Sequence, residues 1–308
     1  MSNHRAILIA GPTASGKSAI ALALAEKLGG VVVNADSMQV YSELRILSAR
    51  PSAGDEARAP HALYGCVPAA QAYSVGRWLE DVSRAIGDAK RLEQVPIITG
   101  GTGLYFKALL DGLSPIPDIP PEIRDYWRAE EGARNAQELH KTLGERDPEM
   151  ARRLRPSDPQ RVIRALEVLD ATGCSLAEWQ NEPGKPVLPA EQALRFFVSP
   201  PREALYARID RRFDSMLERG ALEEVRALAE QDIDPGLPVM RALGVKPLMQ
   251  MLSGNMTRDD AIRRTKTDTR RYAKRQLTWA KRNMIAWKEV LVKDSESIMD
   301  KIFAIIDV

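Results

Sequence analysis

The chain has 308 residues, of which 44% are hydrophobic and 28% are charged. These proportions are typical of a folded globular protein, and the length suits one large domain or two smaller ones. No apolar run reaches the ~18 residues that a membrane span requires, so we expect no membrane protein. Two cysteines and three histidines are too few for a disulfide framework or a Cys/His zinc site, which favours a reducing, cytoplasmic location.

The first motif in the chain is a glycine-rich loop behind a short apolar stretch. Residues 5–10 predict a strand, and residues 11–18 match the phosphate-binding pattern GxxxxGK[ST]. In this pattern backbone N–H groups face phosphate oxygens, Lys17 adds positive charge, and the Ser18 hydroxyl can hold Mg²⁺. A helix predicted over residues 16–28 would point its positive end at the same anion. We therefore predict a polyphosphate site formed by Gly11, Pro12, Thr13, Ala14, Ser15, Gly16, Lys17 and Ser18.

Strand and helix patterns alternate over the first hundred residues. Further strands are predicted at residues 31–34 and 95–99, and a helix at residues 75–90. This alternation predicts an α/β fold with a parallel sheet flanked by helices, whose ligands bind beyond the carboxyl ends of the strands.

Two predicted strand ends carry residues that are capable of chemistry. Asp36 follows one strand and could hold Mg²⁺ or act as a base, or it could accept from its own backbone in an Asp turn. Thr102 follows another strand after two glycines and could donate to an oxyanion, although its residue type alone favours a helix cap. We expect both strand ends to lie at the rim of the sheet with the glycine-rich loop.

The middle of the chain changes in composition. Proline-rich segments at residues 114–121 and 182–189 enclose predicted helices at 121–132, 135–145, 148–154 and 159–172, the last beginning at Asp158 and ending at Gly173. Residues 194–198 then predict a strand that returns to the sheet, and residues 202–308 read as helical. We predict a core over residues 1–113 and 191–308, with a helical insertion domain over residues 114–190.

Positive charge is concentrated in one part of the chain. The net charge is only +2, yet residues 258–293 hold twelve Lys and Arg against four Asp and Glu, a pattern that points to nucleic acid. Tyr272, Trp279 and Trp287 lie among these charges, where aromatic rings could stack on unpaired bases or form the core of an amphipathic helix.

Two pairs of arginines lie on predicted helical faces. Arg208 and Arg212 are four residues apart and could bind a diphosphate, or could pair with Asp210 and Asp214. Arg161 and Arg164 are three residues apart and could contact a phosphate backbone, or could form a solvated face.

Six segments together resemble the tRNA dimethylallyltransferase (isopentenyltransferase) family of bacterial type. They are residues 11–18, 36–41, 100–109, 158–169, 208–220 and 273–279, and they occur in order over nearly the whole chain. Two positions depart from the family pattern, because Arg50 stands where the family usually has lysine and Val245 where it usually has tyrosine.

The resemblance implies transfer of a dimethylallyl group from dimethylallyl diphosphate to N6 of adenosine 37, in the tRNA anticodon loop. It implies a P-loop NTPase-like core with an all-helical insertion domain, a requirement for Mg²⁺ held through Ser18, and a channel entered by the flipped adenine and the prenyl donor from opposite sides. Asp36 is then the expected base, with Thr102 and Arg212 as further catalytic residues. We expect a monomer whose tRNA contacts are Asp36, Ser37, Met38, Gln39, Gln160, Arg161, Arg164, Arg241, Lys246, Arg270, Lys274, Arg275 and Lys281.

Functions of other classes remain possible from the residues alone. One is an adenine-nucleotide isopentenyltransferase or a P-loop small-molecule kinase, whose small acceptor would need neither the basic segment nor the helix at 159–172. Another is a non-catalytic RNA-binding NTPase switch. An apolar strand ending in Asp-Glu, typical of ATP-hydrolysing P-loop proteins, is missing, which disfavours this second alternative.

Overall fold

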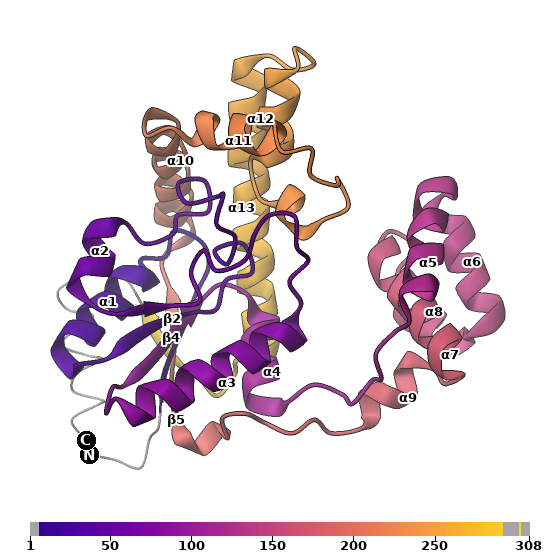
Figure 1. Ribbon diagram of the computed structural model, residues 1–308, viewed down its shortest axis with the longest axis horizontal. Helices are drawn as coiled ribbons and strands as arrows, with labels where there is room; N and C mark the ends of the chain where they lie inside the picture. Colours follow the sequence, from indigo (N-terminus) through magenta and orange to yellow (C-terminus); the bar gives the residue numbers. More distant parts are fainter. Residues whose placement is uncertain (1–5, 292–301, 303–308) are drawn as a thin grey trace. The chain divides into compact units, whose positions relative to one another are not determined.

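The computed structural model describes residues 6–291 and residue 302 (Figure 1). Within these residues one parallel sheet has the strand order β3-β2-β4-β1-β5-β6. Its strands are β1 (Ala6–Ala10), β2 (Val31–Asn34), β3 (His61–Ala62), β4 (Pro96–Gly100), β5 (Ala193–Ser199) and β6 (Lys288–Leu291). The predicted parallel α/β sheet is confirmed. Arg5 and Lys293, which the sequence placed in the first strand and in the basic segment, lie outside the described residues.

Both faces of the sheet are buried, as a parallel sheet requires. Ile7 and Ile9 belong to one apolar cluster with the buried side of α1 (Lys17–Leu28). Leu8 lies in the opposite cluster with residues of α3 (Val75–Arg91) and α4 (Gly103–Asp111). Because side chains alternate along a strand, β1 is covered by helices on both sides and its carboxyl end is left to form the site.

A group of helices completes the part of the chain that contains the sheet. It consists of α2 (Ala53–Arg58), η1 (Ala190–Gln192), α10 (Arg202–Glu218), α11 (Ala221–Ala229), η2 (Pro238–Arg241), α12 (Val245–Leu252) and α13 (Arg258–Asn283). The long helix α13 packs against α10 and α12 (Figure 1).

Several short elements in this part were not predicted, among them β6, α2 and β3. The expectation that residues 202–308 are wholly helical is wrong, because β6 pairs with β5 along Phe196–Ser199. The sequence also gave no sign of α2 or of the two-residue strand β3, since their stabilising contacts come from distant parts of the chain.

The chain divides into two compact units, residues 1–110 with 187–308, and residues 111–186. The second unit is helical in the structure, with α5 (Pro121–Ala133), α6 (Ala136–Arg146), α7 (Pro148–Arg153), α8 (Pro159–Thr172) and α9 (Leu176–Asn181) around a core that includes Trp127 and Leu166. Helix α8 begins and ends as predicted, at the Asp158 cap and at Gly173 with φ +70°. Helix α9 was not predicted.

No helix among the described residues combines the length and the apolar character needed to cross a bilayer.

Candidate active site

The glycine-rich loop joins β1 to α1 and leaves several backbone donors free. Gly16 has φ +93°, a conformation that suits glycine, and it is the residue that begins α1. Among the described hydrogen bonds, the N–H groups of Ala14, Gly16, Lys17 and Ser18 have no protein acceptor. Free N–H groups at a helix N-terminus form an anion site, as the sequence predicts for this loop.

The ammonium group of Lys17 lies in this loop and donates to the Pro12 carbonyl at 3.3 Å. Burial lowers the pKa of Lys17 to about 8, against an opposing effect of the Asp36 carboxylate, and Arg212 lowers it further. The three side chains are therefore near enough to affect one another. A bound anion would favour the charged form of Lys17, since it adds negative charge beside it.

Helix α10 divides its charges between two partners. Arg212 donates to the Thr13 hydroxyl and Arg208 to the Ser15 carbonyl at 3.5 Å, so both guanidinium groups face the glycine-rich loop. The aspartates of α10 point to α13 instead, with Asp210 bound to Arg270 at 3.4 Å and Asp214 to Lys266 at 2.6 Å. The alternative that Arg208 and Arg212 pair with these aspartates is thus wrong.

Asp36 is held beyond the end of β2 by the buried amide of Asn34. The Asn34 amide accepts from the Asp36 N–H at 2.8 Å and donates to the Asp36 carbonyl at 3.0 Å. The Asp36 carboxylate accepts from the Met38 N–H at 3.0 Å, so the Asp turn is present. The turn uses one carboxylate oxygen and leaves the other as an acceptor, so it does not exclude the functional interpretation.

Thr102 joins the ends of β2 and β4. Its hydroxyl accepts from the Ser37 N–H at 3.0 Å and donates to the Ser37 hydroxyl at 3.3 Å. The alternative that Thr102 serves only as the cap of α4 is wrong, because its oxygen is bound to the neighbouring strand end. Gly100 allows this approach, since a Cβ there would lie 2.0 Å from the Ala35 carbonyl oxygen.

Two residues of α13 reach the same place and were not among the predicted site residues. Gln276 accepts from the Thr13 N–H and donates to the Gly101 carbonyl, both at 2.9 Å. Tyr272 lies one turn earlier, and burial raises its pKa, with a further increase from the Asp36 charge and opposing hydrogen bonds to Thr102 and Gln276. The sequence signal was their spacing of four residues, which puts both on one face of the helix.

The other two aromatic residues of the basic segment are packing residues. Trp287 is buried and meets Phe106 edge to face at 5.3 Å. Trp279 packs against Gly103, where a Cβ would lie 2.3 Å from the indole ring. For these two tryptophans the core interpretation holds.

The predicted tRNA-binding residues fall in both units. Gln160, Arg161 and Arg164 lie on α8 of the second unit, where Arg161 pairs with Asp158 and Arg164 with Glu167, each at 3.2 Å. The remaining ones lie in the first unit, where Lys274, Arg275 and Lys281 are exposed on α13 and Arg241 and Lys246 are exposed on η2 and α12.

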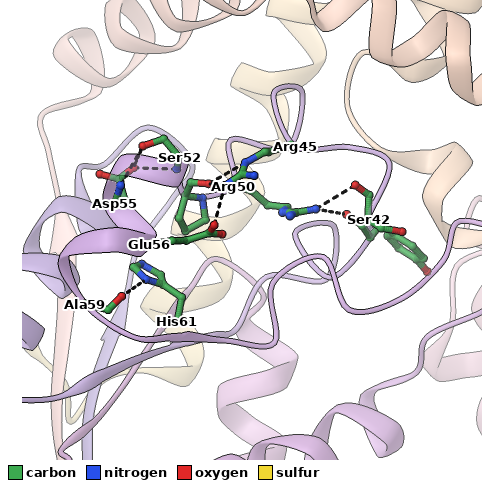
Figure 2. A network of polar contacts seen from close by, with 10 residues as sticks. Ser42, Arg45, Arg50, Ser52, Asp55, Glu56, Ala59 and His61 are labelled. Carbon is green, nitrogen blue, oxygen red and sulfur yellow. Dashed lines mark hydrogen bonds and ion pairs between the residues drawn. The ribbon is translucent and has the colours of Figure 1, made fainter.

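The loop that follows Asp36 is fastened by internal polar contacts (Figure 2). Arg50 donates to the Tyr41 and Ser42 carbonyls at 3.0 and 3.1 Å, and Arg45 donates to the Pro51 carbonyl and to Glu56. The predicted tRNA contact Gln39 donates its amide to the Ser48 and Ala49 carbonyls. These contacts give the loop a defined shape.

The fold and the site together define a P-loop protein of the α/β class, with an anion cradle beside a carboxylate at the rim of a parallel sheet. A family model described as IPP transferase matches residues 39–283, and one described as isopentenyl transferase matches residues 4–59. The chain therefore belongs to the IPP transferase family, as the sequence resemblance implied.

Individual relatives agree with this assignment. The tRNA dimethylallyltransferase of Methylocella silvestris is 56% identical over 286 residues, which cover 92% of this chain and 94% of that protein. That of Mesorhizobium japonicum is 55% identical over 274 residues, 89% of this chain and 85% of that protein. The crystal structure of a tRNA isopentenylpyrophosphate transferase from Bacillus halodurans matches with a TM-score of 0.71 at 31% identity, over 99% of this chain and 96% of that one. A eukaryotic dimethylallyltransferase described as acting on tRNA matches with a TM-score of 0.79 at 31% identity, over 94% of this chain and 74% of that one.

The two departures from the family pattern have structural explanations. Arg50 fits because Gly65 has no side chain, since a Cβ at that glycine would lie 2.2 Å from the guanidinium carbon. Val245 is fully buried in the core cluster, so its side chain is a packing residue in this protein.

Proposed function

We propose that this protein transfers a dimethylallyl group from dimethylallyl diphosphate to N6 of adenosine 37 in tRNA and releases diphosphate. One observation carries the proposal: an anion cradle with two half-buried cations, Lys17 and Arg212, lies beside the Asp36 carboxylate, in a member of a family whose relatives are named for this transfer. The anion cradle suits the leaving diphosphate, and the carboxylate suits the acceptor amine.

The donor half of the reaction would use the glycine-rich loop. As the bond between the allylic carbon and the diphosphate oxygen breaks, negative charge grows on the phosphate oxygens. The free N–H groups of the loop, Lys17 and Arg212 are fixed in advance around that charge, so they stabilise the transition state more than the ground state.

The acceptor half would use Asp36. The exocyclic N6 amine attacks the allylic carbon, and its proton passes to the Asp36 carboxylate as the C–N bond forms. A base in this position contributes roughly 10²–10⁴ to a rate. Asn34 fixes the backbone of Asp36, the Met38 N–H holds its carboxylate, and Thr102 orients the adjoining Ser37. Flipping a loop base into the site costs less than opening a duplex pair.

Magnesium fits this site as a partner of the substrate. Among the described residues no group of three His, Cys, Asp or Glu could form an all-protein metal cage. Mg²⁺ commonly binds through one or two protein oxygens together with substrate phosphates and water. We propose that the Ser18 hydroxyl at the start of α1 is such a ligand, and that the ion would neutralise charge on the departing diphosphate.

The tRNA would be held by the exposed cations of α13, α12 and α8 named above. We further propose that the protein acts as a monomer and that it works in the cytoplasm, where tRNA is its substrate.

The experiment that tests this function compares donors and acceptors directly. Purified protein is incubated with dimethylallyl diphosphate labelled in the prenyl group, and with ATP labelled in the γ-phosphate, each with unmodified tRNA or with AMP. We expect the prenyl label to enter tRNA alone. Label in AMP would support the nucleotide-directed alternative, and tRNA-stimulated ATP hydrolysis without prenyl transfer would support an NTPase switch.

A further inference from the structure

One side-chain amide spans the ends of two strands. Gln276 on α13 accepts from the Thr13 N–H, in the loop after β1, and donates to the Gly101 carbonyl, just beyond β4. Both hydrogen bonds measure 2.9 Å and both join residues more than 170 positions apart. Only an amide side chain of this length both accepts and donates here, because a carboxylate cannot donate and an ammonium cannot accept.

Each end of this bridge leads to a residue of the proposed chemistry. At the end near the prenyl donor, the Thr13 hydroxyl accepts a hydrogen bond from Arg212. The bridge therefore fixes the residue that orients this guanidinium. At the end near the acceptor adenine, Gly101 precedes Thr102, whose hydroxyl accepts from the Ser37 N–H next to Asp36. Gln276 thus connects the groups around the diphosphate with the groups around the adenine.

The surroundings of Gly101 are shaped to admit this amide. A Cβ at Gly101 would lie 2.2 Å from the Gln276 amide nitrogen, whereas its next nearest neighbours would be at 3.4 Å. Among the described residues, the Gln276 amide is the group that a Cβ at Gly101 would meet closer than 3.0 Å, so a side chain at this position provides an independent way to displace the amide.

We propose that Gln276 is a positioning residue that couples donor binding to tRNA binding, an inference that rests on the function proposed above. Helix α13 carries the exposed cations Lys274 and Arg275 in the turn between Tyr272 and Gln276. A tRNA bound to these cations holds α13 in place, and through Gln276 it holds Thr13 and Arg212 in the geometry that binds diphosphate. By linkage the donor must then favour tRNA binding by the same factor.

The test measures this coupling with a donor that cannot react. The Kd of dimethylallyl thiolodiphosphate is determined with and without unmodified tRNA, for the wild type and for Gln276→Met, which keeps the length of the side chain but removes both hydrogen bonds. We expect tRNA to tighten analogue binding by about fivefold or more in the wild type, within the usual range of such couplings. In Gln276→Met the ratio of the two Kd values falls to about one.

Turnover gives a second readout that a loss of folding would not imitate. A positioning role predicts that kcat falls by roughly 10- to 100-fold, because small misplacements of reacting groups have effects of that size. The Kd for tRNA measured without donor changes less than about threefold, since the exposed cations are intact, and the melting temperature stays close to that of the wild type. Gln231→Met, at an exposed glutamine after α11, is the matched control and behaves as wild type.

A double-mutant cycle tests the same bridge from its other end. Gly101→Ala displaces the amide and is expected to lower kcat about as much as Gln276→Ala does. The double variant should be no worse than either single one, because the same contact is lost in all three. Additive losses would mean that Gly101 and Gln276 act independently, which contradicts the inference.

The outcomes separate this inference from the proposed function. A wild type that transfers no prenyl group to tRNA would refute the proposed function. An active wild type whose coupling ratio is unchanged in Gln276→Met would overturn the role of Gln276 alone. If Gln276→Met is unstable, Gln276→Glu replaces it. The Glu side chain keeps the acceptor for the Thr13 N–H but has no donor for the Gly101 carbonyl. A coupling ratio in Gln276→Glu equal to that of the wild type would also overturn the role of Gln276.

Discussion

The two halves of α13 each carry five Lys and Arg but hold them in different ways. In the first half, Lys266 and Arg270 form ion pairs with aspartates of α10, and Arg264 pairs with Asp268. In the second half Lys274 and Lys281 are exposed, and no carboxylate among the described residues pairs with them. A count of Lys and Arg alone treats both halves alike, whereas the structure separates cations that stabilise helix packing from cations that are available to a phosphate backbone.

The same distinction applies around the site itself. Lys17, Arg212 and Asp36 lie close together at the site without forming a closed ion pair, while Glu224 is satisfied entirely by the protein. We expect substitutions of Lys17, Arg212 or Asp36 to change activity, and substitutions of residues such as Glu224 to change stability. Five predictions test this division, in order of their expected effect on activity.

The largest effect is expected for Asp36→Asn. The amide keeps an acceptor for the Met38 N–H but cannot take the N6 proton, so kcat should fall by roughly 10²–10⁴ while the Kd for tRNA stays near that of the wild type. Single-turnover transfer and filter binding measure the two quantities. Asp88→Asn, at an exposed residue of α3, is the control. Turnover equal to that of the wild type would remove Asp36 from the chemistry.

The next effect concerns Lys17 and pH. Its pKa of about 8 in the free protein means that, near pH 9, only about a tenth of the molecules carry the charge, so affinity for inorganic diphosphate should fall about tenfold between pH 7 and pH 9. Calorimetry on the wild type and on Lys17→Met separates the effect of the Lys17 charge on affinity from the effect of the titration of diphosphate itself. A parallel pH dependence in both proteins would contradict a role for the lysine charge.

The same lowered pKa of Lys17 predicts that stability rises with pH, whereas affinity for diphosphate falls with pH. Because burial lowers the pKa from 10.5 to about 8, the unfolded chain binds more protons between these values, and the contribution of Lys17 to stability rises with pH over that window. Below pH 8 the buried charge is unfavourable. Lys17→Met should therefore melt at a higher temperature than the wild type at pH 7, and the difference should shrink as the pH rises toward 10.

A smaller effect distinguishes the two halves of α13 directly. Replacing Lys274 and Lys281 with Gln should reduce the slope of log affinity for tRNA against log salt by about 1–2, since each lost phosphate contact contributes about 0.7–0.9. Replacing Lys266 and Arg270 with Gln should leave this slope unchanged and lower the urea midpoint, because it breaks the ion pairs with α10. The tRNA contact predicted for Arg270 competes with its ion pair, so equal slopes for both double variants would contradict the division.

The smallest effect on activity is expected for Glu224→Ala, which should change stability instead. The Glu224 carboxylate accepts from the N–H groups of Arg45, Ile46 and Leu47 at 3.0, 2.7 and 2.9 Å, and so fastens the loop that follows Asp36. Its loss should lower the free energy of unfolding by about 1.5–3 kcal/mol, as for hydrogen bonds to a charged group. Urea unfolding measures this, and Glu223→Ala, at an exposed neighbour, should have little effect. A large fall in kcat without loss of stability would instead place Glu224 among the functional charges.

Much of the fold and part of the site followed from the sequence for identifiable reasons. The glycine-rich loop, the strand ends and the capped helix α8 are specified by local residue patterns, so β1, α1 and α8 were predicted closely. Strand β6 was missed because four residues with one buried side chain give no pattern of their own, and only pairing with β5 makes them a strand. Gln276 was missed because its role depends on two backbone groups far away in the sequence, and Glu224 for the same reason.

The most direct test of the central claim follows the prenyl group and the diphosphate together. Wild-type protein is mixed with dimethylallyl diphosphate and two otherwise identical tRNA transcripts, one with adenosine and one with guanosine at position 37. Incorporated label and released diphosphate are both counted. We predict equal amounts of the two products, found only with the adenosine transcript and located at that nucleotide. Diphosphate release that does not depend on the transcript, or label at other positions, would contradict a site in which the glycine-rich loop and Asp36 act on the same reaction.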